Sequence, residues 1–237
     1  GYGTQAFCAG ADIGKFPSML GDKEQSADYA RNCSRLLVHL DKCQKPVVAA
    51  LNGLTLGGGL ELAMRCQGLV AVDTAWMQLP EVTLGIVPGI GAMVVPYRRW
   101  PHAALVFNRM LTKAEKLTAR RAEEIGMIST VVGTPQALIP AAIKSIDKLT
   151  GCPHKITDAP VNIASFPPYD ADSKTILSGE IISLIEKAVL EAAAASSLEK
   201  ALEIGYHAFG DSACTKAARE GITAFLERRK PDFGKTG

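Results

Sequence analysis

The sequence predicts an α/β domain that is followed by an all-helical region. The short apolar runs 47–51 and 68–72 are typical of strands that are buried on both faces. A good helix former, 60–65, separates them, and a strand, a crossover helix and a second strand make an α/β unit. Further along, residues 176–208 are rich in alanine and predict helix.

The spacing of apolar residues and the positions of proline and glycine predict the remaining elements in the first half of the chain. Residues 24–43 should form a helix, because Leu36, Leu37 and Leu40 recur at helical spacing among charged residues. Residues 76–100 are apolar but interrupted by proline and glycine, so they are expected to be irregular.

The second half contains one short helix, one loop and one final helix. Thr118 precedes a short helix that Gly126 should end. Residues 151–172 are proline-rich and lack periodicity, which predicts a loop. Residues 215–229 should form the last helix.

Composition and charge narrow the class of protein. The chain has 237 residues, of which 47% are apolar, so it can bury a core without disulfides or metals. The net charge of +2 arises from 26 basic and 24 acidic residues without long runs, which favours neither a nucleic acid nor a membrane as partner. We interpret the basic segments 98–99, 120–121 and 228–230 as solvated helix ends.

Cysteine and histidine spacing predicts neither disulfides nor a metal site. The six cysteines include no C-x-x-C pair, so we expect free thiols in a reducing, cytoplasmic compartment. The four histidines are dispersed, and no cluster of metal-ligand type is expected. No stretch reaches the length of a membrane span, and the first residues do not resemble a signal peptide.

The strongest chemical signal is the glycine triplet 57–59, which opens the helix 60–65. It lacks the Lys of a phosphate-binding loop. Three glycines are costly in backbone entropy, by roughly 0.5–1 kcal/mol each, so a group should approach the backbone closely there. The free N–H groups of a first helical turn can stabilise an oxyanion.

Two glutamates lie in apolar surroundings near this turn. Glu61 is in the first turn itself, where it could simply favour the helix dipole. Glu81 lies between Leu79-Pro80 and Val82, where it could simply point to solvent. Two carboxylates in apolar settings beside oxyanion donors would instead suit paired acid–base chemistry.

Several linked motifs in order give the chain a family resemblance. They are FCAGADI at 7–13, KPVVAALNG at 45–53, LGGGLELA at 56–63, LPEVTLG at 79–85, PGIG at 88–91, TA at 118–119 with Ala122 and GMI at 126–128, and GITAFLERRKP at 221–231. The chain resembles the crotonase superfamily, the enoyl-CoA hydratases and isomerases. The resemblance is strong over 6–132, absent over about 151–175 and present again at the end.

The resemblance implies a fold, an activity and a set of site residues. The fold would be a spiral of β-β-α units, with a C-terminal helical trimerisation region. The activity would be hydration of an enoyl-CoA to a 3-hydroxyacyl-CoA in β-oxidation, with coenzyme A entering on the substrate and no further cofactor. The implied roles are catalysis by Glu61 and Glu81, an oxyanion hole from the N–H groups of Ala11 and Gly58, and coenzyme A or substrate contacts by Ala9, Gly10, Asp12, Ile13 and Gly57.

Where the sequence departs from the family pattern, it suggests how the chain is divided and what is missing from it. Residues 1–132 would be a crotonase core without the family's opening strand–helix–strand unit, and 133–237 a helical region. The chain would then be a truncated piece, and a fusion with an upstream 3-hydroxyacyl-CoA dehydrogenase would fit this pattern. Ala92–Val95 replace the usual Gly-Thr-Gln-Arg, and Gln78 replaces a common glycine, which leaves the acyl preference open.

Alternative functions remain open from sequence. Both glutamates are present, which favours a hydratase, whereas an isomerase or a hydrolase is the alternative within the superfamily. A non-catalytic scaffold that binds coenzyme A or forms oligomers is the alternative from another class. The helix 186–204 and the final helix are candidate subunit contacts in a trimer or a dimer of trimers. An RNA-binding role has little support, since no basic stripe with interleaved aromatics occurs.

Overall fold

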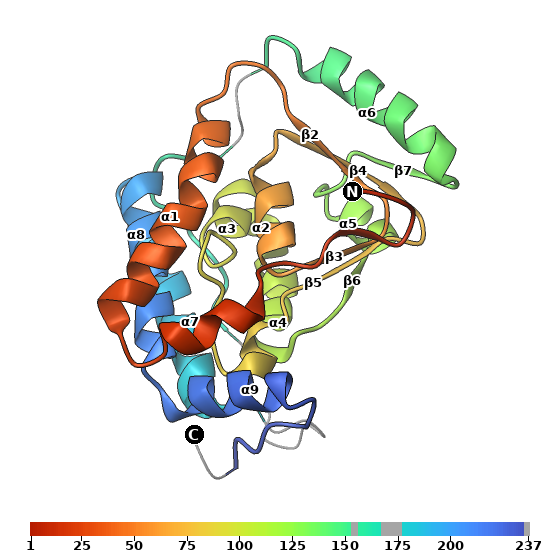
Figure 1. Cartoon of the computed structure of the whole chain (residues 1–237). Coiled ribbons are helices and arrows are strands. Elements are labelled where there is room, and N and C mark those ends of the chain that lie inside the picture. Colours follow the sequence, from red (N-terminus) through yellow and green to blue (C-terminus); the bar gives the residue numbers. More distant parts are fainter. Residues whose placement is uncertain (153–155, 167–176, 235–237) are drawn as a thin grey trace.

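The computed structural model describes residues 1–152, 156–166 and 177–234, which fold into two small sheets surrounded by helices (Figure 1). The first sheet has the order β1-β3-β5-β6, with β1 Ala6–Cys8, β3 Leu54–Leu56, β5 Trp76–Gln78 and β6 Leu117–Thr118. The second has the order β2-β4-β7, with β2 Val48–Leu51, β4 Gly68–Val72 and β7 Thr130–Val132. All pairs are parallel except β5 with β6.

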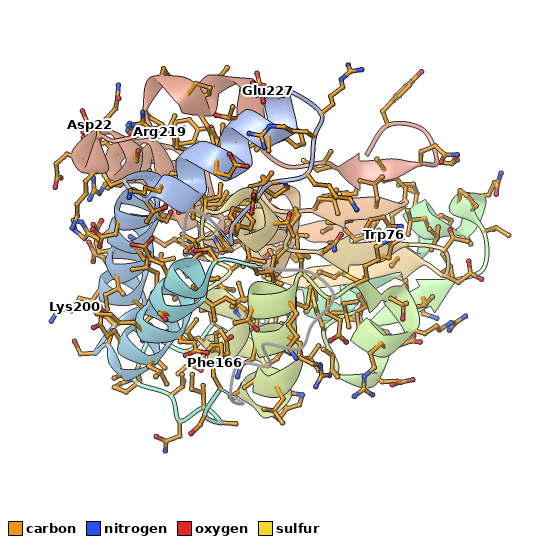
Figure 2. All side chains as sticks on the ribbon, turned by 90° about the horizontal axis from the view of Figure 1, so that it is seen from below. Asp22, Trp76, Phe166, Lys200, Arg219 and Glu227 are labelled. Atoms are coloured by element: carbon orange, nitrogen blue, oxygen red, sulfur yellow. The ribbon has the colours of Figure 1, made fainter. Side chains whose placement is uncertain are left out.

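Helices connect and cover these sheets. The α-helices are α1 Lys23–Asp41, α2 Gly58–Arg65, α3 Val95–Arg99, α4 Ala104–Lys113, α5 Ala119–Glu124, α6 Pro135–Leu149, α7 Gly179–Ala194, α8 Leu198–Ala213 and α9 Lys216–Leu226. The 3-10 helices are η1 Ile13–Ser18, η2 Glu81–Leu84 and η3 Pro101–Ala103. The α6 helix packs on the second sheet, and α1 packs against α8 (Figure 1). The turn that precedes α1 also lies beside α9, because a Cβ on Gly21 would lie 3.8 Å from Nη2 of Arg219 (Figure 2).

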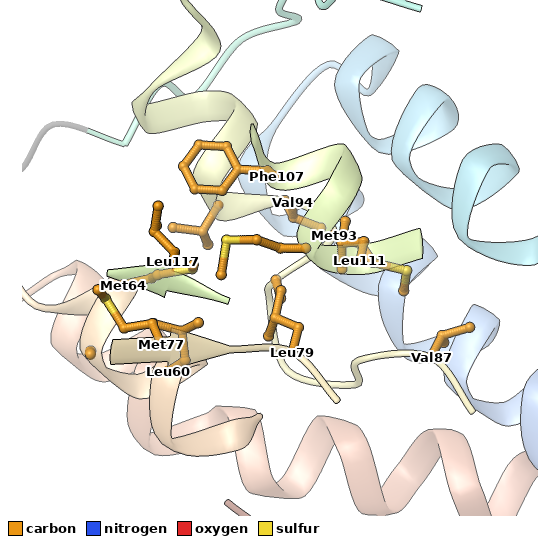
Figure 3. Close-up of a cluster of buried hydrophobic side chains, with 14 of the residues drawn as sticks. Leu60, Met64, Met77, Leu79, Val87, Met93, Val94, Phe107, Leu111 and Leu117 are labelled. Carbon is orange, nitrogen blue, oxygen red and sulfur yellow. The ribbon is translucent and has the colours of Figure 1, made fainter. Parts of the chain in front are cut away.

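The core forms where α2, the first sheet and α4 meet (Figure 3). Leu60 and Met64 of α2 face Met77 of β5 and Phe107 of α4, and all four side chains are fully buried. The apolar face of α2 therefore fixes the helix that carries Glu61 against the sheets.

The predicted α/β unit is confirmed, with one difference in burial. The β2 strand pairs in parallel with β4 through the crossover that contains α2. All of β4 is buried, but β2 alternates between half-buried and buried residues. The prediction that 47–51 is buried on both faces is therefore wrong, because β2 lies at the edge of its sheet.

The predicted irregularity of 76–100 is also partly wrong. This segment contains β5, η2 and α3. Strands of three residues, such as β3 and β5, are too short to show an alternating pattern. Tertiary pairing in the first sheet fixes them instead.

The helices predicted at 24–43, after Thr118 and at 215–229 are confirmed. The Thr118 hydroxyl caps α5 by accepting from the Arg121 N–H at 3.2 Å, and Gly126 has a left-handed φ of 72° just beyond the helix. The α1 and α9 helices are also present, with α9 ending at Leu226. The described part of the proline-rich segment, 156–166, has no regular secondary structure, and the rest of that predicted loop lies outside the described residues apart from Gly151 and Cys152.

The helical character predicted for 176–208 is confirmed over the described residues, where two helices, α7 and α8, form it. The α7 helix ends at Ala194, and α8 begins at Leu198 after the Ser197 hydroxyl accepts from the Lys200 N–H at 3.2 Å. The Arg98 guanidinium satisfies the carbonyl groups at the end of α7, including those of Ala192 and Ala195 at 2.9 and 2.7 Å. A serine cap on one side and an arginine on the other therefore stabilise the break.

The interpretation of Arg98 and Arg99 as a solvated helix end is wrong. Only 1% of Arg98 is exposed, and its guanidinium also donates to the carbonyls of Thr157 and Ala159 at 3.0 and 2.6 Å. By contrast, Arg120 and Arg121 are exposed, as the sequence predicted.

None of the described helices is both long and apolar enough to cross a membrane. Among the same residues, no group of three or more His, Cys, Asp or Glu side chains is arranged to hold a metal ion.

Replacement of Arg98 should destabilise the fold strongly. The Arg98→Met variant keeps an apolar stem but leaves four carbonyl groups without their donor, of which the one on Ala192 is buried and the others are partly buried. We expect the free energy of unfolding to fall by about 3 kcal/mol or more. Arg120→Met is the matched control, because its exposed pair with Glu123 should contribute less than about 1 kcal/mol. Urea denaturation of both variants tests this, and equal losses would contradict it.

Candidate active site

One cavity of about 970 Å³ gathers the residues that the sequence singled out. It lies between η1, α1, the start of α2, η2 and the helices α8 and α9. Its lining includes all nine predicted site residues, namely Ala9, Gly10, Ala11, Asp12, Ile13, Gly57, Gly58, Glu61 and Glu81. The structure therefore brings together the segments 9–13 and 57–61, which are about 45 residues apart in sequence, and places Glu81 beside them.

A tight turn at Gly57 connects β3 to α2. Gly57 has a φ of 48°, which favours glycine, and its N–H donates to the Gln78 carbonyl at 3.0 Å. A Cβ at this position would lie 2.6 Å from Oε1 of Glu81. The missing side chain thus leaves the room that the Glu81 carboxylate occupies.

Glycine occupies the other two positions of the triplet for different reasons. A Cβ on Gly59 would lie 2.6 Å from the Cβ of Cys8, so Gly59 lets α2 pack directly on β1. A Cβ on Gly58 would meet its nearest atom, Ile90 Cδ1, at an ordinary 3.6 Å. The predicted close approach is therefore explained at two glycines by the protein itself, and Gly58 borders the cavity.

Two backbone N–H groups lie close together at this point. The Cβ position of Gly58 is 3.9 Å from the N atom of Ala11, and that of Gly10 is 3.5 Å from the N atom of Gly58. Gly10 has a φ of 95°, which turns the chain after β1. Neither the Ala11 nor the Gly58 N–H has an acceptor among the described residues. Both are therefore available to an oxygen in the cavity.

Glu61 is a buried and well-held carboxylate. Only 3% of it is exposed, and its Oε1 accepts from the N–H groups of Ile90 and Ala92 at 2.9 and 2.8 Å. Burial raises its pKa above 4.5, while these two N–H groups and the Arg65 charge act in the opposite direction. The prediction that Glu61 has little water around it is confirmed.

The Glu81 carboxylate has fewer hydrogen-bond donors than that of Glu61. Glu81 is the first residue of η2, and its Oε2 is buried without a hydrogen-bond partner among the described residues. Burial, and next the negative charge of Glu61, raise its pKa to about 8. At neutral pH Glu81 therefore holds a proton, whereas two N–H donors favour the ionised form of Glu61.

The segment 9–13 forms another wall of the cavity. The Asp12 carboxylate also accepts from the Gly14 N–H at 3.1 Å and caps η1, so part of its role is structural. Sequence reasoning missed Ile90 and Ala92, which act through backbone N–H groups that any residue carries. It also missed Arg65, although its place four residues after Glu61 on one helix face was a readable signal.

The comparisons with known proteins agree with this fold. Residues 1–161 match the family model described as enoyl-CoA hydratase/isomerase. An acidic pair enclosed with two free N–H donors on a fold of short β-β-α units fits that class. The chain belongs to the enoyl-CoA hydratase/isomerase family, and the predicted crotonase-type α/β fold is confirmed.

Individual relatives match over almost the whole chain. The chain is 30% identical to a crotonyl-CoA hydratase from Syntrophomonas wolfei, over 98% of this chain and 78% of the relative. It is 31% identical to a probable enoyl-CoA hydratase from Bacillus subtilis, over 96% and 77%. The crystal structure of an enoyl-CoA hydratase from Bacillus anthracis superposes with a TM-score of 0.56 at 26% identity, covering 98% of this chain and 78% of that one.

The shared enclosure of Glu61 and Glu81 predicts a pH-dependent stability. The pKa of each is higher in the folded state than the unfolded value of 4.5, so the folded protein binds more protons than the unfolded chain above that pH. Stability should therefore be fullest below about pH 4.5 as far as these groups contribute, and should fall as the pH rises to about 8.

Urea denaturation at a series of pH values between 5 and 8 measures this dependence. Glu81→Gln should remove most of the slope, because Gln cannot lose the proton that burial retains. Glu124→Gln, a change at an exposed position of α5, should leave the slope as it is. A slope that survives in Glu81→Gln would contradict the assignment.

Proposed function

We propose that this protein is an enoyl-CoA hydratase, which adds water across the 2,3 double bond of an enoyl-CoA to give a 3-hydroxyacyl-CoA in β-oxidation. The observation that carries the proposal is the paired environment of Glu61 and Glu81. The Glu61 carboxylate accepts from two backbone N–H groups, whereas Oε2 of Glu81 is buried without a partner among the described residues. Two relatives that match almost the whole of this chain carry hydratase names.

The N–H groups of Ala11 and Gly58 would bind the thioester carbonyl oxygen. Addition at C3 of a conjugated thioester moves negative charge onto that oxygen and makes the transition state enolate-like. Donors that are already in place stabilise this charge without reorganisation. Their lack of acceptors among the described residues supports this role.

Glu61 and Glu81 would divide the proton transfers between them. Ionised Glu61 takes a proton from water as the water oxygen bonds to C3. Protonated Glu81 gives its proton to C2. The water thus adds as OH and H, and the net result is that Glu61 has gained the proton that Glu81 has lost. A proton exchange between the carboxyl groups or with solvent resets the pair.

The coenzyme A part of the substrate would lie along Ala9, Gly10, Asp12, Ile13 and Gly57, which line the same cavity. Two apolar side chains of α9, Phe225 and Leu226, also line it and are about half exposed, at 52% and 47%. Such exposed apolar groups suit contact with the apolar portion of a long ligand. Coenzyme A enters on the substrate, and the proposed reaction needs no other cofactor.

Higher organisation is a separate proposal. Copies of the chain would associate as a trimer or a dimer of trimers, which is supported by exposed apolar residues such as Leu190 on α7 and Phe225 on α9. A cytoplasmic location is the proposal that follows from the cysteine pattern. The division at 132, the absent opening unit and the upstream dehydrogenase fusion stay predictions from the sequence.

Conversion of either glutamate to glutamine should remove hydratase activity. With crotonyl-CoA as substrate, we expect Glu61→Gln and Glu81→Gln each to lower kcat by roughly 100- to 10,000-fold, because each loses a proton-transfer group. Loss of the conjugated thioester absorbance measures turnover, and chromatography identifies 3-hydroxybutyryl-CoA. Glu124→Gln is the control and should keep full activity.

The same assay separates the competing functions. Turnover of a 3-enoyl-CoA to the 2-enoyl isomer that survives Glu61→Gln, without hydration, would establish an isomerase instead. Coenzyme A binding without any turnover would establish a scaffold. Either result would overturn the hydratase proposal.

A further inference from the structure

A fully buried arginine lies directly behind the proposed base. Arg65 follows Glu61 by four residues on α2, so the two side chains share one helix face. None of the Arg65 side chain is exposed. Burial of a guanidinium is expensive, so its contacts should account for its presence.

These contacts join two separate segments. The Arg65 Nε donates to Asp41 Oδ1 at 2.8 Å, and its Nη2 pairs with Asp41 Oδ2 at the end of α1. The Nη1 donates to the Ile90 carbonyl at 3.1 Å. A Cβ on Gly91, where φ is 141°, would lie 3.1 Å from Nη1, so a glycine there leaves the guanidinium its room.

The segment that Arg65 holds is the one that holds Glu61. The carbonyl of Ile90 accepts from Arg65, while the N–H groups of Ile90 and Ala92 both donate to Glu61 Oε1. The 90–92 backbone is therefore fixed from one side by the arginine and presents its donors to the carboxylate on the other. Asp41 in turn orients the guanidinium through two of its nitrogens.

We propose that Arg65 and Asp41 are positioning residues of the reaction, which fix the 90–92 backbone so that its N–H groups hold the Glu61 carboxylate toward the substrate. This inference rests on the proposed role of Glu61 as base. A buried ion pair is by itself weak evidence for stability, because well-packed apolar residues often replace one without loss. Its connection to both sides of the Glu61 cradle gives the pair a function in addition to joining α1 and α2.

Electrostatics gives this role a second readout. The charged or titratable groups that act on Glu61 are Glu81 from η2 and Arg65 from α2, and Asp41 on α1 pairs with Arg65. Tyr206 of α8 and Arg99 of α3 lie within electrostatic range of the same pair. Arg65 lowers the pKa of Glu61. Removal of its charge should therefore raise that pKa and move the acid limb of the pH–rate profile upward.

Two variants separate position from charge. Arg65→Lys keeps the charge but cannot donate to Asp41 and Ile90 together in one plane, so kcat for crotonyl-CoA hydration should fall roughly 10- to 100-fold, with KM and the acid limb little changed. Asp41→Asn with Arg65→Met removes both charges and leaves no unpaired buried ion. This double variant should lose kcat similarly and shift the acid limb of kcat/KM upward by about one pH unit.

Arg31→Met is the matched control. It breaks another ion pair of α1, with Glu203 of α8. Within the part of the chain that the structure describes, no hydrogen bond or ion pair joins Arg31 to the 90–92 segment, so this variant should change neither kcat nor the acid limb. Thermal unfolding and circular dichroism of all variants confirm folding, and Arg65→Lys serves if the double variant does not fold. Wild-type turnover with unchanged kcat and pH profile in folded Arg65 variants would overturn the positioning role and leave the hydratase intact.

A measurement without turnover keeps the two proposals apart. If the wild type does not hydrate crotonyl-CoA, the hydratase proposal fails, and NMR titration of ¹³C-labelled glutamate carboxyls then decides the link to Glu61. Glu61→Gln assigns the resonance. An upward shift of its titration in the double variant, absent in Arg31→Met, supports the coupling of Arg65 to Glu61. An unshifted titration overturns it.

Discussion

The left-handed turn at Gly57 is the constraint on which the site depends. It ends β3, starts α2 and leaves space for the Glu81 carboxylate where a side chain would stand. The same turn leaves the Gly58 N–H without an acceptor among the described residues and places Glu61 in the first turn. One backbone conformation thereby sets an oxyanion donor and two carboxylates around one cavity, and any Cβ at 57 would disturb all three.

Enclosure of the two carboxylates has an energetic consequence that runs against stability. Burial raises the pKa of both Glu61 and Glu81, so ionising the pair in the folded state costs free energy that the unfolded chain does not pay. That cost is unequal, because the N–H groups of Ile90 and Ala92 stabilise one anion alone. The asymmetry favours the ionised form of Glu61 over that of Glu81, and different environments for two identical side chains are what paired acid–base chemistry requires.

Much of this site was predictable from sequence, because the glycine triplet and the apolar neighbours of Glu61 and Glu81 are local signals. The α1, β2, β4 and α9 elements were predictable for the same reason, since each has a clear period or apolar run. The failures involve partners that lie far away in sequence. Arg98 reads as a solvated helix end until the carbonyls of 157, 159, 192 and 195 enclose it, and two of these carbonyls, those of 192 and 195, belong to the unpredicted break after α7.

Both ends and one face of α2 take part in contacts that hold the site, which explains why so short a helix can organise it. The Gly58 N–H at its start borders the cavity, and the carbonyls of Met64 and of the capping residue Cys66 at its end accept from Arg99. A cation at the C-terminus complements the helix dipole, so Arg99 stabilises the same helix whose N-terminus is left open for a ligand. Glu61 and Arg65 then use one face to join the 90–92 backbone from both sides. Eight residues alone would not hold a helix in water, so packing and these contacts together keep the donors in place.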